Sequence, residues 1–246
     1  MSREFDNIVI FFVDNSAFLV KNEYKRALRQ AQGPRLLNMA ETSLDTKKKL
    51  LESAKKEFLE KGFMNASLRT IAANAGVTTG AMYRHFKDKN AFFCALVDEA
   101  IEVTEKTVML AGSDSHADLL TPHKQQHHKL EEQEVKLFLD YVFDNFDAFT
   151  LLLTKAAGSE HEHFQEEICE LYTKTCLQTF NWMYKNKIAS KKVQPMTVHF
   201  MASTVINAYC DIILHNMTKK DAATYIKDIM EFTRYGSMHL MGMKDN

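Results

Sequence analysis

The stretch TIAANAGVTTGAMYRHFKDK, residues 70–89, decides the fold of this 246-residue chain. Gly76 permits a left-handed turn, and Ser67 lies where it can cap the short helix before that turn. Thr78 follows the turn and can cap a second short helix that runs to about His85. The stretch therefore predicts two short helices joined by a tight turn, which is a helix-turn-helix.

A longer helix is predicted on each side of this motif. Upstream, apolar residues recur at helical spacing until Gly62 supplies a C-terminal cap, and lysines occupy the opposite face. These apolar residues are Leu50, Leu51, Ala54, Phe58 and Leu59. Downstream, a helix is predicted to begin near Asp88 or Lys89 and to run past Met109.

The composition favours an all-helical chain. Eight glycines and three prolines are too few for the many tight turns of a sandwich or barrel. The net charge is only −1, yet residues 46–92 hold ten lysines and arginines against four aspartates and glutamates. This uneven placement concentrates positive charge on the helix-turn-helix segment.

Cysteine usage and the N-terminal apolar run bear on location. Cys94, Cys169, Cys176 and Cys210 form no close CxxC pair, which favours free thiols in a reducing, cytoplasmic setting. The run Ile8–Val13 is much shorter than the roughly 20 residues that a bilayer span needs. We expect neither membrane insertion nor export.

The quoted stretch closely resembles the helix-turn-helix signature of TetR/AcrR regulators, and the resemblance covers about 47 residues, including the upstream helix and the Gly62-Phe63 pair. The resemblance implies an all-α fold with a three-helix DNA-binding domain at residues 45–92. A helical effector-binding and dimerisation domain would follow at 93–246. It also implies a transcriptional repressor that binds a palindromic operator in double-stranded DNA as a homodimer and is released by a small molecule. An activator role remains open.

The front of the second short helix consists of small residues, which would let its backbone approach a DNA groove about 12 Å wide. Thr78, Thr79, Gly80 and Ala81 form this front. We expect Thr79 and Ala81 to contact bases, through a hydroxyl and a methyl group respectively. Thr78 could instead serve only as a helix cap.

Behind this front, Met82 and Phe86 lie four residues apart and face the core, which turns the three residues between them outward. By the resemblance, Tyr83 and His85 donate to phosphate oxygens. Arg84 could pair with guanine or lie along a phosphate.

Two flanking residues are further candidates for phosphate contact. By the resemblance, Lys89 donates to a phosphate where the next helix begins, a position that also favours an anion. Ser67 is a second candidate. As alternatives, Tyr83 could only cover the core, and Lys47, Lys48 and Lys49 are interpreted as a solvated face.

Residues 1–38 match no helical or strand pattern for long, and Gln32-Gly33-Pro34 would break any element before it. We expect a loosely attached, disordered extension. A second hypothesis is that Met39, rather than Met1, is the natural start of translation, and that the preceding residues are upstream sequence.

Helical patterns resume after a polar stretch from Gly112 to about Lys129, which is interpreted as a solvated loop. They cover Val135–Thr154, Glu160–Asn186, Met196–His215 and Lys219–Met241. Aromatic side chains in this half are candidates for an apolar effector pocket, although core packing would also explain them. The six candidates are Phe138, Tyr141, Phe146, Phe149, Tyr172 and Trp182.

The last two helices carry broad apolar faces, and the resemblance assigns them to the dimer interface. One face comprises Val198, Met201, Val205, Tyr209 and Ile212. The other comprises Tyr225, Ile229, Phe232 and Met238.

Three alternatives to a ligand-released repressor are open. A cluster of histidines suggests a metal sensor as the first alternative: His116, His123, His127, His128, His161 and His163. However, His161-Glu162-His163 is not an HExxH motif. We therefore expect neither a metal nor another cofactor. An all-helical enzyme finds no support in a GxSxG elbow or a phosphate-binding glycine loop. A DNA-binding regulator controlled by a protein partner is equally compatible with the sequence.

Overall fold

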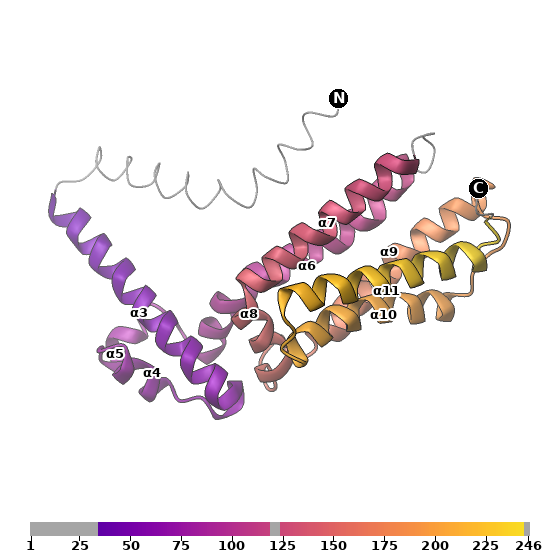
Figure 1. The fold of residues 1–246 in the computed structure, drawn as a ribbon. Coiled ribbons are helices and arrows are strands. Elements are labelled where there is room, and N and C mark those ends of the chain that lie inside the picture. The colour runs from indigo at the N-terminus through magenta and orange to yellow at the C-terminus, as the bar shows by residue number, and fades with distance from the viewer. Residues whose placement is uncertain (1–33, 119–123, 244–246) are drawn as a thin grey trace. The chain divides into compact units, whose positions relative to one another are not determined.

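A computed structural model describes residues 34–118 and 124–243 of the chain, with side chains described for residues 43–111 and 133–243. All regular elements in these ranges are helices (Figure 1). They are α3 (Pro34–Asn65), α4 (Leu68–Asn74), α5 (Thr79–Met82), α6 (Lys89–Asp118), α7 (Lys124–Asp144), α8 (Phe146–Thr150), the π-helix η1 (Leu151–Lys155), α9 (Phe164–Lys185), α10 (Pro195–Leu214) and α11 (Lys219–Leu240). The predicted all-α class is confirmed.

The chain divides into two compact units, residues 1–50 and residues 51–246. The predicted domain boundary at 92 and 93 falls inside the continuous helix α6, and that division remains a proposal. Residues 1–33 of the predicted extension lie outside the described residues. The hypothesis that translation starts at Met39 stays a prediction. Residues 34–38 belong to α3, which begins at Pro34, so the prediction of disorder is wrong for them. Proline is favoured there because the first helical N–H has no partner within the helix.

The helix-turn-helix is built on a small core of aromatic and aliphatic side chains. Phe58, Phe63 and Phe93 form a triangle with ring centroids 5.4 to 5.9 Å apart. Ile71 from α4 and Met82 from α5 are fully buried in the same unit. This burial is what holds α5 in place, because a helix of four residues is unstable by itself.

Local backbone features match the sequence prediction. Ser67 caps α4 by accepting from the Thr70 N–H, and Thr78 caps α5 by accepting from the Ala81 N–H. Gly62 and Gly76 have φ of 73° and 70°, the left-handed region that glycine adopts without strain. The break predicted at Gly62 is present, although a short helical segment continues to Asn65.

A buried carboxylate connects α3 to the start of α4. Glu57 Oε1 accepts from Lys61 Nζ and from the Ser67 backbone N–H, both at 3.0 Å. Burial alone would raise the pKa of Glu57, but these two hydrogen bonds outweigh it and lower the pKa below its usual value. The carboxylate thereby fixes the residue that caps α4, in addition to the Ser53 hydroxyl, which donates to the Ile71 carbonyl.

The C-terminal part of the unit is a helical bundle, in which α9 packs against α6 and α10, and α10 packs against α11. One core cluster joins Leu139 of α7 to Ile212 of α10 and Ile226 of α11. By length and composition α10 could cross a membrane. We interpret it as a core helix instead, since eight of its residues are buried within the bundle.

The structure corrects three predictions about these elements. Residues 112–118 and 124–129 are helical, in α6 and α7, so the predicted solvated loop is wrong there. The helix predicted over Val135–Thr154 is interrupted at Asn145. The second short helix of the motif ends at Met82, and a turn covers the residues to His85.

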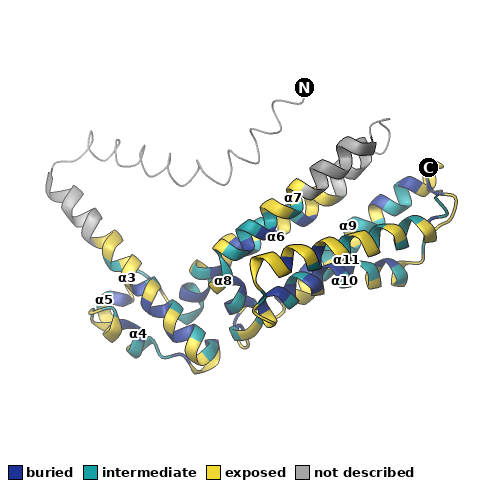
Figure 2. Cartoon of the chain, viewed as in Figure 1, coloured by how far each residue is buried: buried dark blue, intermediate teal, exposed yellow. Residues whose placement is uncertain are grey.

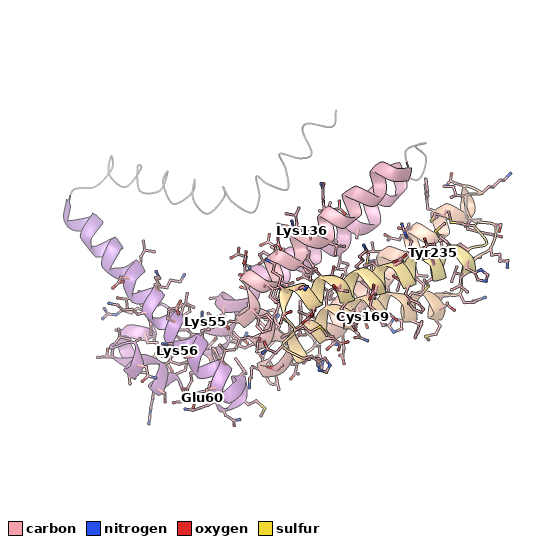
Figure 3. The ribbon with its side chains drawn as sticks, in the orientation of Figure 1. Lys55, Lys56, Glu60, Lys136, Cys169 and Tyr235 are labelled. Atoms are coloured by element: carbon pink, nitrogen blue, oxygen red, sulfur yellow. The ribbon has the colours of Figure 1, made fainter. Side chains whose placement is uncertain are left out.

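We predict that Glu57→Ala lowers the free energy of unfolding by about 1–3 kcal/mol, because it leaves the part-buried Ser67 N–H and the partly exposed Lys61 ammonium without their acceptor. Urea denaturation of the full chain measures this. Glu60→Ala is the matched control, since Glu60 projects from α3 in an exposed position (Figure 3) and its loss should change stability by less than about 0.5 kcal/mol. Equal effects of the two substitutions would contradict the assignment.

Candidate nucleic-acid interface

The exposed surface of the helix-turn-helix is formed by α5 and the turn that follows it. Thr78, Thr79 and Gly80 are exposed, and Ala81 is half-buried. Figure 2 shows exposed surface at α5. Because the Thr78 hydroxyl accepts the Ala81 N–H at 3.1 Å, the capping role is confirmed, and its own O–H stays available as a donor. Thr79 and Ala81 remain the predicted base contacts.

Gly80 lies in α5 without a structural need for glycine. Its backbone is helical, and a Cβ atom built there would meet no protein atom within 4 Å. Glycine inside a helix is about 0.5–1 kcal/mol less favourable than alanine. The protein's own packing does not explain this glycine, but the close approach of an external surface would.

The three residues after Met82 differ in exposure. Tyr83 is 52% exposed, Arg84 is exposed and His85 is half-buried. Met82 and Phe86 are buried, as predicted, with Phe86 stacked on Phe92 at a centroid distance of 3.9 Å. The turn thus presents a phenol, a guanidinium and an imidazole above an apolar base, a set of donors suited to phosphate oxygens and base edges.

Lys89 is held more tightly than the sequence indicates. Its Nζ donates to the Met64 carbonyl at 2.9 Å and to the Ala66 carbonyl at 3.4 Å, and it lies 4.8 Å from the centroid of the Phe63 ring. The ammonium therefore satisfies carbonyls after α3 and retains one N–H for another acceptor. A phosphate contact by Lys89 remains a prediction.

Two neighbours of Lys89 refine the expected anion site. Asp88 Oδ1 accepts the Ala91 N–H at 2.7 Å, so one of the amides at the start of α6 is already satisfied. Lys87 has an 82% exposed side chain whose Nζ lies 3.9 Å from Asp88 Oδ2. Lys87 is one of the ten basic residues of the segment 46–92 and has no contact predicted from the sequence. Its exposure beside the turn makes it a further candidate for phosphate binding.

The remaining basic residues lie mostly on α3. Lys55, Lys56 and Glu60 project from this helix (Figure 3), and Lys55 Nζ pairs with Asp147 of α8 at 3.2 Å. Ser67 is half-buried, and its hydroxyl accepts from the Thr70 N–H at 3.4 Å. Its capping role is shown, and its phosphate contact remains a prediction.

The six candidate pocket residues do not form one group. Tyr141 of α7 stacks edge-on against Phe149 of α8 at 6.3 Å, and Phe138 stacks against Tyr209 of α10 at 5.2 Å. By contrast, Trp182 packs at the end of α9 with a separate cluster that contains Met183, Ala189 and Met241. Phe146 lies near Phe143, and Tyr172 hydrogen-bonds the Cys176 side chain within α9.

Tyr141 is the most informative of these residues. Its hydroxyl is buried and has no hydrogen-bond partner in the described part of the chain. Burial and the nearby carboxylates of Glu99 and Glu102 raise its pKa to about 12. A buried hydroxyl without a partner is uncommon in folded proteins, so it marks a position where a ligand atom could bind.

The predicted dimer faces are divided between the inside and the outside of the bundle. Val198, Val205 and Ile212 are buried within the protomer, so they cannot form an interface with a partner. Phe232 of α11 and Phe200 of α10 are each 64% exposed. The other members of the predicted faces, Met201, Tyr209, Tyr225, Ile229 and Met238, are partly buried.

The histidines of the metal-sensor alternative fall in two groups. The side chains of His116, His123, His127 and His128 lie outside the described residues. His161 and His163 precede α9, and each lies within 4 Å of acidic side chains.

Comparison with known proteins agrees with this geometry. Residues 50–96 match the family "Bacterial regulatory proteins, tetR family". The HTH-type transcriptional repressor BepR of Brucella suis is 36% identical over 76 residues, 31% of this chain and 36% of BepR. The HTH-type transcriptional regulator TtgR of Pseudomonas putida is 32% identical over 80 residues, 32% of this chain and 38% of TtgR.

Solved structures extend the similarity of fold beyond the helix-turn-helix. The structure of NalD, described as the secondary repressor of the MexAB-OprM multidrug efflux pump in Pseudomonas aeruginosa, aligns with a TM-score of 0.52 at 20% identity, covering 78% of this chain and 96% of NalD. A SmeT–triclosan complex aligns with a TM-score of 0.53 at 16% identity, covering 78% and 90% of the two chains. At these identities the similarity concerns the fold alone.

Residues 50–96 therefore resemble the helix-turn-helix region of the TetR family of bacterial regulatory proteins. The named relatives are transcriptional regulators and not enzymes. The similarity to BepR and TtgR spans less than two fifths of their lengths.

We predict that Gly80→Ala weakens DNA binding by about tenfold or more while raising the free energy of unfolding by about 0.5–1 kcal/mol. The added methyl has free space in the protein but would stand between α5 and a groove. Fluorescence anisotropy and urea denaturation of the same variant measure the two effects. Gly76→Ala, at a positive φ, should instead lose about 1–2 kcal/mol of stability. Unchanged DNA affinity in Gly80→Ala would contradict close approach at this position.

Proposed function

We propose that this protein is a ligand-responsive transcriptional repressor that binds a palindromic operator as a homodimer and is released by a small, partly apolar molecule. The observation that carries the proposal is the small-fronted helix α5, with exposed Thr79, Gly80 and Tyr83 above a rigid apolar core. This arrangement suits a groove, because the front permits backbone approach while the donors at its rear reach the phosphates.

Dimerisation through α10 and α11 is supported by apolar side chains that these helices leave exposed. Besides Phe200 and Phe232, Met196 of α10 is 76% exposed and Tyr235 of α11 is 49% exposed. Figure 3 shows Tyr235 on α11. Large apolar side chains gathered on neighbouring helices are typical of an interaction surface. A twofold-symmetric dimer would place its two helix-turn-helix units on the two half-sites of a palindrome.

Release by a ligand is supported by the continuity of α6. This helix begins at Lys89, directly after the helix-turn-helix, and packs against α8 and α9 in the other half of the unit. A molecule that bound beside Tyr141 more tightly in one arrangement of these helices would bias the position of α6, since only a difference in affinity shifts an equilibrium. The buried, unpartnered Tyr141 hydroxyl favours a ligand with one polar group on an apolar body.

DNA binding is tested by titrating duplexes that contain the palindromes upstream of the protein's own gene, at several salt concentrations. We expect Lys87→Ala to reduce the slope of log affinity against log salt by about one, because one phosphate contact is lost. Lys136→Ala is the matched control, since Lys136 is an exposed lysine of α7 (Figure 3) and should leave the slope unchanged. Affinity that is independent of salt, or absent for every palindrome, would contradict the proposed function.

The dimer is tested by sedimentation of Phe232→Ala. A phenylalanine at a twofold interface is buried once in each protomer, so its loss should weaken the dimer by about 3–6 kcal/mol and raise its dissociation constant by at least about a hundredfold. Leu137→Ala is the control, because Leu137 is also an exposed apolar residue, 52% exposed, but lies on α7. A wild-type protein that stays monomeric at micromolar concentration would contradict this interface.

A further inference from the structure

Three potential metal ligands converge where α6 meets the loop before α9, and a fourth acidic side chain lies near one of them. Cys94 and Asp98 lie one turn apart on α6, and Glu160 and His161 lie in the loop. The ligand atoms of Cys94, Glu160 and His161 all lie within 4.8 Å of one another. His161 Nε2 is 3.5 Å from Asp98 Oδ1 and 3.6 Å from Glu160 Oε1.

The Nε2 atom of the His161 ring has no hydrogen-bond partner in the described part of the chain. This atom is buried, while the whole side chain is 20% exposed. The two carboxylate oxygens nearest to it are farther away than the roughly 2.9 Å of an N–H···O hydrogen bond. Two ligands at about 2.0–2.1 Å from a tetrahedral ion would be about 3.3 Å apart, which is closer to the observed spacing.

The loop that carries Glu160 and His161 is fixed by its own hydrogen bonds. The Glu160 N–H donates to Asn90 Oδ1 of α6 at 3.3 Å, and the His161 N–H donates to Ser159 Oγ at 3.2 Å. Gly158 turns the chain before them with φ of 83°. Both ligands are therefore positioned by the backbone, as a binding site requires.

We propose that Cys94, Asp98, Glu160 and His161 form a binding site for a divalent transition-metal ion of the zinc class. A thiolate, an imidazole and carboxylates are ligands that such an ion prefers, whereas Mg²⁺ and Ca²⁺ favour sets made of oxygen alone. When the ion binds, the Cys94 S–H bond breaks heterolytically, the sulfur keeps the electron pair as a ligand, and the proton leaves to water. No oxidation or reduction takes place.

Without a metal ion, the thiol proton of Cys94 connects two of the proposed ligands. Cys94 Sγ donates to Glu160 Oε1 at 2.6 Å. Burial and this carboxylate raise the pKa of Cys94 to about 12, so the free thiol is neutral. The metal ion would replace the thiol proton as the positive partner of Glu160.

The site has a consequence for regulation, and this consequence rests on the proposed function. Cys94 lies one turn into α6, close to where the helix leaves the helix-turn-helix, and Glu160 precedes α9. A metal ion would join these two elements and restrict the movement of α6 against α9. Metal occupancy should thus change operator affinity without touching the DNA.

The test uses the full chain without a histidine tag, stripped with a chelator and titrated with Zn²⁺ and, separately, Co²⁺. We expect one ion bound per protein chain and, with Co²⁺, a thiolate-to-cobalt charge-transfer band. Cys94→Ala and His161→Ala should each weaken Zn²⁺ binding by about a hundredfold or more, and Cys94→Ala should abolish the band. Cys94→Ser and Asp98→Asn serve as conservative second variants, and circular dichroism verifies that each variant is folded.

Two matched controls separate this site from other thiols and histidines. Cys169→Ala removes a partly buried thiol of α9, which lies 3.1 Å from Ser203 Oγ, and His163→Ala removes an exposed histidine that pairs with Glu162 and Glu166. Both controls should bind Zn²⁺ like the wild type. Unchanged stoichiometric binding in Cys94→Ala, or no charge-transfer band in the wild type, would overturn the site.

Operator binding with and without Zn²⁺ distinguishes the two proposals. If the protein binds the operator but does not bind Zn²⁺ or Co²⁺ at all, the metal site is overturned and the proposed function stays intact. Stoichiometric metal binding through Cys94 without any operator binding would support the site and contradict the proposed function.

Discussion

The position of α5 depends on the burial of Met82 and Phe86. A four-residue helix has too few internal hydrogen bonds to offset the conformational entropy that it loses. Its exposed residues are therefore held by the residues behind them, because Met82 is fully buried and Phe86 stacks on Phe92 of α6. The rings of Phe58, Phe63 and Phe93 meet at angles and distances typical of favourable aromatic pairs. The candidate DNA-binding surface is thus rigid because of residues that DNA would never contact.

Much of the helix-turn-helix could be predicted because its determinants are local in sequence. The caps at Ser67 and Thr78, the glycine at position 76 and the four-residue spacing of Met82 and Phe86 act within a few residues of where they stand. The prediction of a solvated loop after Gly112 is wrong because it relied on the missing apolar periodicity of that stretch. Glutamate, glutamine and lysine are nevertheless good helix formers, and the structure assigns helix on both sides of residues 119–123.

What could not be predicted depends on contacts between distant residues. Val198 and Met201 belong to one predicted apolar face of α10, yet Val198 is fully buried and Met201 only partly, because the neighbouring helices decide how far each position is covered. Cys94 and Glu160 are 66 residues apart, so no spacing rule could have paired them. The exposure of Lys87 and the engagement of Lys89 with carbonyls after α3 likewise follow from tertiary packing.

The same helix serves both halves of the molecule, and this shared use limits how a signal could pass between them. The start of α6 carries Lys89 and closes the aromatic core, and its later turns pack against α9. Because α6 is continuous from Lys89 to Asp118, with no break to absorb a displacement, a shift imposed beside α9 must reach the helix-turn-helix as movement of the whole helix. A ligand near Tyr141 and a metal ion at Cys94 would act on the same element by different means. The ligand would change how the helices pack, whereas the metal ion would join α6 to the loop before α9 and so oppose that change.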